Sequence, residues 1–254
     1  MILNLKTDEF VFDYMESGDV DPVLLESHCH AQFEMIAVLE GDVNVMLEGK
    51  GYHLKEGQTI LIPPLCYHSI TVNESATYRR VTALFDLGAI PSVLHDEMLK
   101  RNADAAISYS PYMEKLKELL EKEDPSFYVP LAKSLMVQLF YDCLRPSDKS
   151  VDRKTDAFLQ EVIAYIDRHL NEKITLDDLS KYTSRSKSSF CHLFEDKMKI
   201  SPKQYILQKK LALASKLISE GTPPTVAAIR IGYENYSDFY RLYVKHFGKA
   251  PTRR

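Results

Sequence analysis

The sequence contains no run of about 18 apolar residues, the length that a membrane-spanning helix requires. Its first residues carry no basic segment followed by an apolar one, so we expect no signal peptide. The four cysteines are scattered without the regular spacing of a disulfide framework, which favours reduced thiols. Together these absences predict a cytoplasmic protein that has no membrane partner.

Charge is divided unevenly along the chain. Residues 151–254 contain 19 Lys and Arg against 12 Asp and Glu, whereas residues 1–150 contain 13 against 24. A basic part joined to an acidic part indicates that the basic part binds a polyanion. The 254 residues are enough for two domains of ordinary size.

Short apolar runs separated by turn signals fill residues 5–87. The runs at 43–47, 59–62 and 77–85 are rich in β-branched and aromatic residues, which favour strands. Closely spaced short strands of this kind predict an antiparallel barrel or sandwich over residues 1–90.

Helical spacing replaces this pattern from about residue 92. Apolar residues recur at helical intervals in 111–124 and again in 127–144, which predicts two amphipathic helices within a segment 91–144. These helices either cap the barrel or pair two chains as a homodimer. Residues 145–155 have no apolar period and are interpreted as an interdomain linker.

The remaining residues, 156–254, contain an internal repeat. Phe190 and Phe239 are 49 positions apart, and so are Phe194 and Tyr243. Each copy contains a short helix, a turn and a second helix, which is the helix-turn-helix pattern, at 174–197 and 224–246. Thr175 and Thr225 are the expected N-caps of the two short helices.

A connecting helix is predicted between the two copies. Ser201 is the expected N-cap, Pro202 suits the first helical position, and Gly221 suits the position after the helix. A helix over 202–219 is about 27 Å long. That length is compatible with two recognition helices in successive major grooves, which lie about 34 Å apart.

The repeat resembles the DNA-binding domain of the AraC/XylS family of bacterial transcription regulators. The second copy follows the family pattern of a Gly-aromatic pair, a Phe-x-Arg core and a closing Gly-x-x-Pro. The matching residues are Gly232, Tyr233, Ser237, Phe239, Arg241, Tyr243, Lys245, Gly248 and Pro251; in the first copy they are Leu179, Ser186, Phe190, Phe194, Pro202 and Tyr205. The first copy departs from the family at Ser184, where a glycine is usual and a left-handed backbone would be strained.

The resemblance implies which side chains contact double-stranded DNA. The family reads base edges with the exposed face of each second helix, and Arg241 is well suited to a bidentate bond with guanine. The expected base contacts are Ser188, Cys191, His192, Ser237, Tyr240 and Arg241. The expected phosphate contacts, which position the protein without reading sequence, are Lys187, Lys197, Lys203 and Lys245.

A second group of residues lies in the predicted barrel. His28, His30 and Glu34 have equal parity, so on an extended strand they would share one face, and His68 follows in a later strand. The spacing resembles the two cupin motifs, although Leu65 to Tyr67 lack the usual glycine before the histidine. Three imidazoles and a carboxylate can hold Fe(II), Mn(II), Zn(II) or Ni(II). In the AraC family the same positions also occur as pocket lining, which requires no metal or other cofactor.

Three functions fit these features. The first is a non-enzymatic transcription regulator of α+β two-domain architecture, whose cupin-like barrel binds a sugar or other small effector. The resemblance further implies a homodimer that activates through RNA polymerase. The alternatives are a metal-dependent cupin enzyme with an accessory DNA-binding domain, and a metal sensor in which His28, His30, Glu34 and His68 bind the effector itself.

Overall fold

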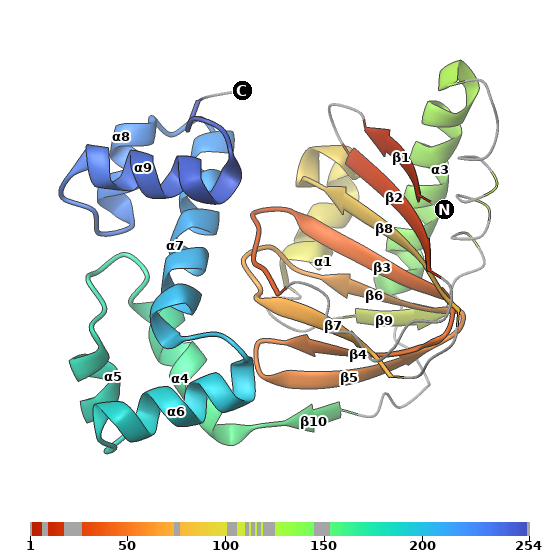
Figure 1. Ribbon diagram of the computed structural model, residues 1–254. Helices are drawn as coiled ribbons and strands as arrows, with labels where there is room; N and C mark the ends of the chain where they lie inside the picture. Colours follow the sequence, from red (N-terminus) through yellow and green to blue (C-terminus); the bar gives the residue numbers. More distant parts are fainter. Residues whose placement is uncertain are drawn as a thin grey trace. The chain divides into compact units, whose positions relative to one another are not determined.

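The structure is a computed structural model that describes residues 2–6, 10–17, 27–73, 77–100, 106–109, 112, 115, 118, 125–144 and 153–252. Contacts divide it into two compact units, the second of which contains all of the chain from Thr155 onward. The first unit is built on two β-sheets and the second on helices alone (Figure 1). The predicted α+β two-domain architecture is confirmed.

Antiparallel strands form the first unit. One sheet has the order β1-β2-β8-β3-β6-β9, and the other has the order β10-β5-β4-β7. The predicted runs 43–47, 59–62 and 77–85 correspond to three of these strands. The strands are β1 Ile2–Lys6, β2 Phe10–Ser17, β3 Phe33–Glu40, β4 Asp42–Leu47, β5 Lys50–Lys55, β6 Gln58–Ile62, β7 His68–Val72, β8 Tyr78–Phe85, β9 Ala106–Tyr109 and β10 Arg153–Thr155.

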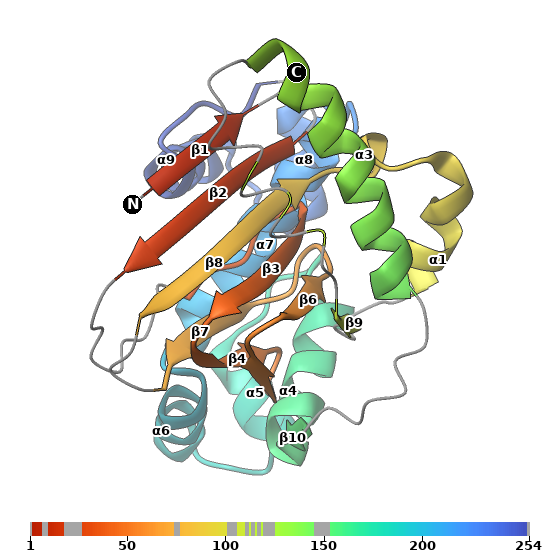
Figure 2. The ribbon, with the colours of Figure 1, turned by 90° about the vertical axis from the view of Figure 1, so that its right-hand side faces the viewer.

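A long helix, α3 (Pro125–Leu144), covers one face of the six-stranded sheet (Figure 2). Met136, Leu139 and Phe140 are fully buried against Met35, Phe85 and their neighbours on that face. Side chains along β3 point alternately to the two faces of the sheet. Phe33, Met35 and Ala37 face the helix, whereas Glu34 and Ile36 point to the opposite side. Short helical segments also precede α3, among them η1 Leu87–Ala89, η2 Ser92–Leu94 and α1 His95–Lys100.

Two short strands occur where no strand was predicted. Residues 106–109 form β9, which pairs antiparallel with β6, although helices alone were expected from about residue 92. Residues 153–155, expected to be linker, form β10 at the edge of the four-stranded sheet. Both strands are too short for a periodic pattern, so only pairing with a sheet edge defines them. The helix expected over 111–124 lies mostly outside the described residues.

The second unit contains six helices among its described residues. It includes the two predicted helix-turn-helix motifs, α5–α6 and α8–α9, with α7 running between them (Figure 1). The helices are α4 Ala157–Arg168, α5 Leu176–Tyr182, α6 Lys187–Met198, α7 Pro202–Ser219, α8 Pro224–Arg230 and α9 Tyr236–Phe247. The predicted connecting helix is confirmed at both ends, with Ser201 as its N-cap.

The N-caps follow the prediction in the first motif and differ in the second. Thr175 accepts a hydrogen bond from the backbone N–H of Asp178, whose carboxylate accepts in return from the Thr175 N–H, so the pair forms a capping box. The prediction that Thr225 caps α8 is wrong. That helix begins at Pro224 with Pro223 as its N-cap and has no side-chain cap, because proline supplies the first-turn dihedral angle without a donor to satisfy.

In the part of the chain that the structure describes, every helix is too short or too polar to cross a lipid bilayer.

Candidate functional site

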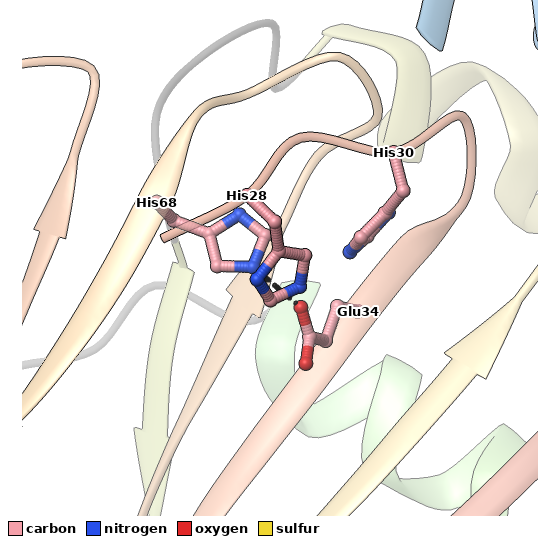
Figure 3. A group of neighbouring side chains, drawn as sticks. All are labelled: His28, His30, Glu34 and His68. Atoms are coloured by element: carbon pink, nitrogen blue, oxygen red, sulfur yellow. Dashed lines mark ion pairs between the residues drawn. The ribbon is translucent and has the colours of Figure 1, made fainter. Parts of the chain in front are cut away.

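Four side chains in the barrel converge on one point. His28, His30, Glu34 and His68 each direct a nitrogen or oxygen toward a common centre, and these ligand atoms all lie within 4.8 Å of one another (Figure 3). Glu34 is on β3 and His68 is the first residue of β7. The structure therefore brings together the four residues that the sequence analysis grouped.

The reason for the convergence differs in part from the predicted one. His28 and His30 precede β3, which begins at Phe33, so they do not share a strand face with Glu34. Their loop is held by a backbone hydrogen bond in which the Leu65 N–H donates to the His30 carbonyl at 2.8 Å. Leu65 has a φ of +62°, and it belongs to the segment in which the cupin pattern has a glycine. A leucine in this left-handed region costs about 1 kcal/mol, which the loop contacts must offset.

The four residues differ in exposure. The side chains of Glu34 and His68 are 7% and 1% exposed, and Nε2 of His68 lies 2.7 Å from Oε2 of Glu34. His28 is exposed and His30 is half-buried, and their rings are 5.4 Å apart between centroids. The site thus has a buried carboxylate–imidazole pair on one side and two more accessible imidazoles on the other. A charge as deeply buried as Glu34 requires a partner of opposite charge, and a histidine or a cation meets that need.

A polar cluster that the sequence analysis missed lies on the four-stranded sheet. Nε2 of His53 is 2.7 Å from both carboxylate oxygens of Asp42, and the Asn73 amide also donates to Asp42. Burial raises the pKa of Asp42, but the bonds from Asn73 and His53 outweigh it and leave the pKa lowered. His53 and Asn73 border a groove of about 500 Å³ together with Asn44 and Thr71. They are far apart in sequence and come together only through strand register, so no local pattern indicates them.

The second helix of each helix-turn-helix motif buries one face and exposes the other. Phe190 and Phe194 of α6, and Phe239 and Tyr243 of α9, are buried as predicted. The opposite face carries the expected base-reading residues. Ser188, His192, Ser237, Tyr240 and Arg241 are exposed, and Cys191 is half-buried. Their contacts with DNA remain a prediction.

The expected phosphate-binding lysines have different surroundings. Lys203 and Lys245 are exposed. Nζ of Lys187 is 2.7 Å from Oδ1 of Asp177, in a pair whose side chains are more than half exposed. Lys197 is half-buried and bonds to Asp156, the N-cap of α4, which lowers the pKa of that carboxyl despite its partial burial. Lys197 therefore joins two helices as well as adding positive charge.

A buried lysine on α7 links the turn of the second motif to the segment before the first, and the sequence analysis did not identify it. Lys210 of α7 donates to the Glu172 carbonyl, in the segment before the first motif, and to the Ile231 carbonyl at 2.6 Å, in the turn of the second. It is only 7% exposed, and burial lowers its pKa. Gly232 lies directly against this junction: a Cβ there would be 3.0 Å from the Glu172 carbonyl carbon and 3.2 Å from the Lys210 nitrogen. A lysine at a core-facing helical position was the signal that could have revealed the junction.

Comparisons with known families agree with this arrangement. Residues 11–163 match the AraC-like ligand binding domain, which is more than half of the chain, and residues 179–253 match a helix-turn-helix domain. The chain belongs to the AraC family. It therefore carries a ligand-binding domain followed by a helix-turn-helix domain, the domain order of an effector-responsive regulator.

Relatives within the AraC family align over different lengths. The HTH-type regulator YdiP of Escherichia coli is 33% identical over 100 residues, covering 39% of this chain and 33% of YdiP. YobQ of Bacillus subtilis is 24% identical over 90% of this chain and 88% of its own length. The melibiose operon regulatory protein of Escherichia coli is 20% identical over 91% of this chain and 83% of its own.

The first two curated relatives are matched over only 33% and 42% of their own lengths. A crystal structure of ToxT from Vibrio cholerae aligns over 97% of this chain and 96% of its own, with 10% identity and a TM-score of 0.42.

Proposed function

We propose that this AraC-family chain is a sequence-specific transcription regulator whose affinity for DNA changes when the barrel binds a small effector. The supporting observation is the pair of helices α6 and α9, each with a buried aromatic face and an exposed polar face. An exposed helix face of this kind is what enters a major groove. An effector shifts the equilibrium only if it binds the DNA-competent and the incompetent state with different affinities.

The test of DNA recognition compares two arginines. Arg241 lies on the exposed face of α9, where Asp238 accepts a bond from it, and Arg230 is an exposed arginine on α8, the first helix of the motif. Arg241→Ala should weaken binding to the preferred site by about 5- to 150-fold, because one bidentate base contact contributes about 1–3 kcal/mol. The matched control Arg230→Ala should bind within about twofold of the unaltered protein.

Footprinting on DNA from the chain's own genomic neighbourhood would supply the binding site. Equal losses in the two arginine variants would contradict base reading by Arg241. The same footprint, repeated with a panel of sugars, tests the effector class, since the melibiose operon regulatory protein is one relative. A protein that gives no protected site on any double-stranded fragment would overturn the proposed function.

Salt dependence tests the phosphate contacts separately. Lys245→Ala should lower the slope of log affinity against log salt by about 1, because one fewer counterion is released. The loss should be similar on specific and unrelated DNA, since phosphate contacts carry no sequence information. An unchanged salt slope would show that Lys245 is an ordinary solvated side chain.

A homodimer formed through α3 is the second part of the proposal. One stripe of this helix, opposite its buried face, is exposed at Leu131, Ser134, Gln138 and Tyr141, and the two large residues are about half exposed. Leu131→Glu with Tyr141→Glu should shift the protein toward monomer in analytical ultracentrifugation. Val93→Glu alters another exposed apolar residue, on η2, and should leave the oligomeric state unchanged.

Activation through RNA polymerase completes the proposal. The support is family membership, and the test is transcription in vitro from the footprinted promoter with purified polymerase. Transcript yield should rise with the regulator and fall back with Arg241→Ala. A decrease in yield on adding the unaltered protein would identify a repressor.

A further inference from the structure

We propose that His28, His30, Glu34 and His68 bind one divalent transition-metal ion, and that occupancy by this ion is the signal that changes DNA affinity. The second half of this inference rests on the function proposed above. The first half stands on the barrel alone, because it depends only on the positions and chemistry of these four side chains.

The distances fit a single ion. Ligand atoms bound at about 2.1 Å to one ion are about 3.0–3.4 Å apart when adjacent and at most about 4.2 Å apart when opposite. The four donor atoms lie within 4.8 Å of one another, and the Glu34–His68 pair is 2.7 Å apart. Binding therefore requires that the widest pair approach by a few tenths of an ångström and that the Glu34–His68 pair separate by a similar amount. The rotation of side chains alone covers such shifts.

The donor chemistry selects the class of metal. Three imidazoles and one carboxylate suit Mn(II), Fe(II), Ni(II) and Zn(II), whereas Mg(II) and Ca(II) require mainly oxygen ligands. The buried Glu34 carboxylate supplies one negative charge, so an occupied site has a net charge close to +1 in place of the full +2 of the ion. His28 is exposed and His30 is half-buried, so the ion can reach the site from solvent past these two side chains.

The arrangement also suggests how occupancy changes the protein. Glu34 and His68 lie on strands of different sheets, since β3 belongs to the six-stranded sheet and β7 to the four-stranded one. His28 and His30 lie on the loop before β3, which is bonded to Leu65. One ion would thus fasten the two sheets and the loops 28–31 and 63–67 together.

Direct binding is the first measurement, and it uses the full chain stripped of metal. Zn(II) should bind at one equivalent per chain in a chelator-competition titration, Co(II) should give visible d–d absorption, and Mg(II) should give neither signal. His28→Ala with His30→Ala should weaken Zn(II) binding by at least about 100-fold, because loss of a group that only hydrogen-bonds to a metal ligand already costs about 10- to 100-fold. These two residues lie outside the buried core, so the variant should keep the circular dichroism spectrum of the folded protein.

Two further variants test whether zinc binds at these four residues and whether the charge of Glu34 contributes to its affinity. His53→Ala removes a histidine of the same barrel that pairs with Asp42, and it should leave zinc affinity and stoichiometry unchanged. Glu34→Gln keeps the shape of the buried side chain and removes its charge, so zinc affinity should fall. Zinc binding that is weaker than about 1 mM, or that is equal in the double variant and the unaltered protein, would overturn the site.

DNA affinity is the second measurement. Zn(II) should change the dissociation constant on the footprinted site at least about fivefold in the unaltered protein and not in the double variant, which corresponds to a modest coupling energy. Tight zinc binding with unchanged DNA affinity would overturn the regulatory half of the proposal. Absence of DNA binding under all conditions would contradict the proposed function, whereas the zinc titration would still decide the metal site.

Discussion

The two helix-turn-helix motifs have the same design and use different residues to achieve it. In both, the first helix ends in a Schellman motif, with N–H bonds from Ser184 to Lys181 and from Arg185 to Ser180 in one, and the equivalent bonds from Gly232 and Tyr233 in the other. This ending requires a left-handed residue, which is Ser184 at φ +52° in the first motif and Gly232 at φ +81° in the second.

The same difference, a non-glycine left-handed residue in the first motif and a glycine in the second, recurs where the second helix of each motif ends. Lys199 at φ +56° closes α6, and Gly248 at φ +67° closes α9. The turn is also one residue longer in the second motif, with five residues between α8 and α9 against four between α5 and α6. The first motif thus has two non-glycine residues in the strained left-handed region, and a capping box stabilises its first helix. The second motif avoids the strain with glycine and has no side-chain cap on its first helix.

Among the substitutions that probe this difference between the motifs, Gly232→Ala should lower the unfolding free energy the most. The φ of +81° is unfavourable for alanine, and the new Cβ would meet the Glu172 backbone at 3.0 Å. Together these should cost about 2–4 kcal/mol of unfolding free energy. Gly248→Ala is the matched control, because it shares the left-handed backbone but has open space around it, and it should cost only about 1 kcal/mol. Denaturant unfolding measures both, and equal losses would show that contact with Glu172 is unimportant.

Lys210→Met should have the next largest effect, because it leaves the carbonyls of Glu172 and Ile231 without the buried ammonium. We expect a loss of about 2 kcal/mol, partly offset by the removal of a buried charge. Hydrogen exchange should show faster opening in both motifs, unlike Gly248→Ala, whose effect should be confined to α9. Exchange that changes in one motif only would contradict the role of Lys210 as a junction.

The lowered pKa of Lys210 adds a pH test. The unfolded chain holds this proton up to about 10.5, whereas the folded protein releases it at lower pH because of burial. Between the two pKa values the unfolded state binds more protons, so the unfolding free energy should rise with pH relative to Lys210→Met. Below the lowered pKa the difference should be constant.

Thr175→Ala should cost about 1 kcal/mol, because it removes one half of the capping box in the first motif. The matched change in the second motif is Thr225→Ala, which should be nearly neutral since Thr225 does not cap α8. A similar loss in both variants would mean that the capping bond contributes little. Thermal unfolding of the full chain is sufficient to measure the pair.

Ser184→Gly and Lys199→Gly should each stabilise the protein by about 0.5–1 kcal/mol, because glycine relieves the left-handed strain at some cost in unfolded-state entropy. Lys199 also lies 3.6 Å from Asp196, but that pair is exposed and contributes little. In both variants, the backbone amides of the first motif should be more strongly protected from hydrogen exchange. A decrease would show that the first motif carries no strain at these positions.

The smallest effect is expected at low pH. Bonds from Thr175 lower the pKa of Asp178, so the stability that its carboxylate contributes is present above its ordinary pKa of 3.8 and is lost as the pH falls through the lowered value. Asp178→Asn should flatten this acid dependence in the first motif. The second motif, whose first helix has no such carboxylate at its cap, should show no matching change in hydrogen exchange.

Features that depend on neighbouring residues could be predicted from the sequence. Phe190, Phe194, Phe239 and Tyr243 could be assigned to the core because helical periodicity is a local signal. The left-handed backbone at Ser184 was predicted because a glycine is expected there. By contrast, Thr225 was wrongly assigned as a cap, since two prolines before it start the helix two residues earlier than predicted.

Long-range features were less accessible. The four barrel residues were identified by spacing, but His28 and His30 reach the site from a loop that strand parity does not describe. Strand β9, the Asp42–His53 cluster and the Lys210 junction depend on contacts between residues distant in sequence. No local pattern encodes the first two, and the only local sign of the third is a lysine at a core-facing position of α7.

The Lys210 junction has a consequence for the operator. Because α7 connects the two motifs and Lys210 bonds the turn of the second to the segment before the first, two helices that read bases as proposed would meet them at a constant rotational phase. Each base pair inserted between the two contacted segments turns one segment by about 34–36° around the duplex axis. A rigid reader cannot follow that turn, so natural operators for this chain should vary in base composition between the segments but not in their length.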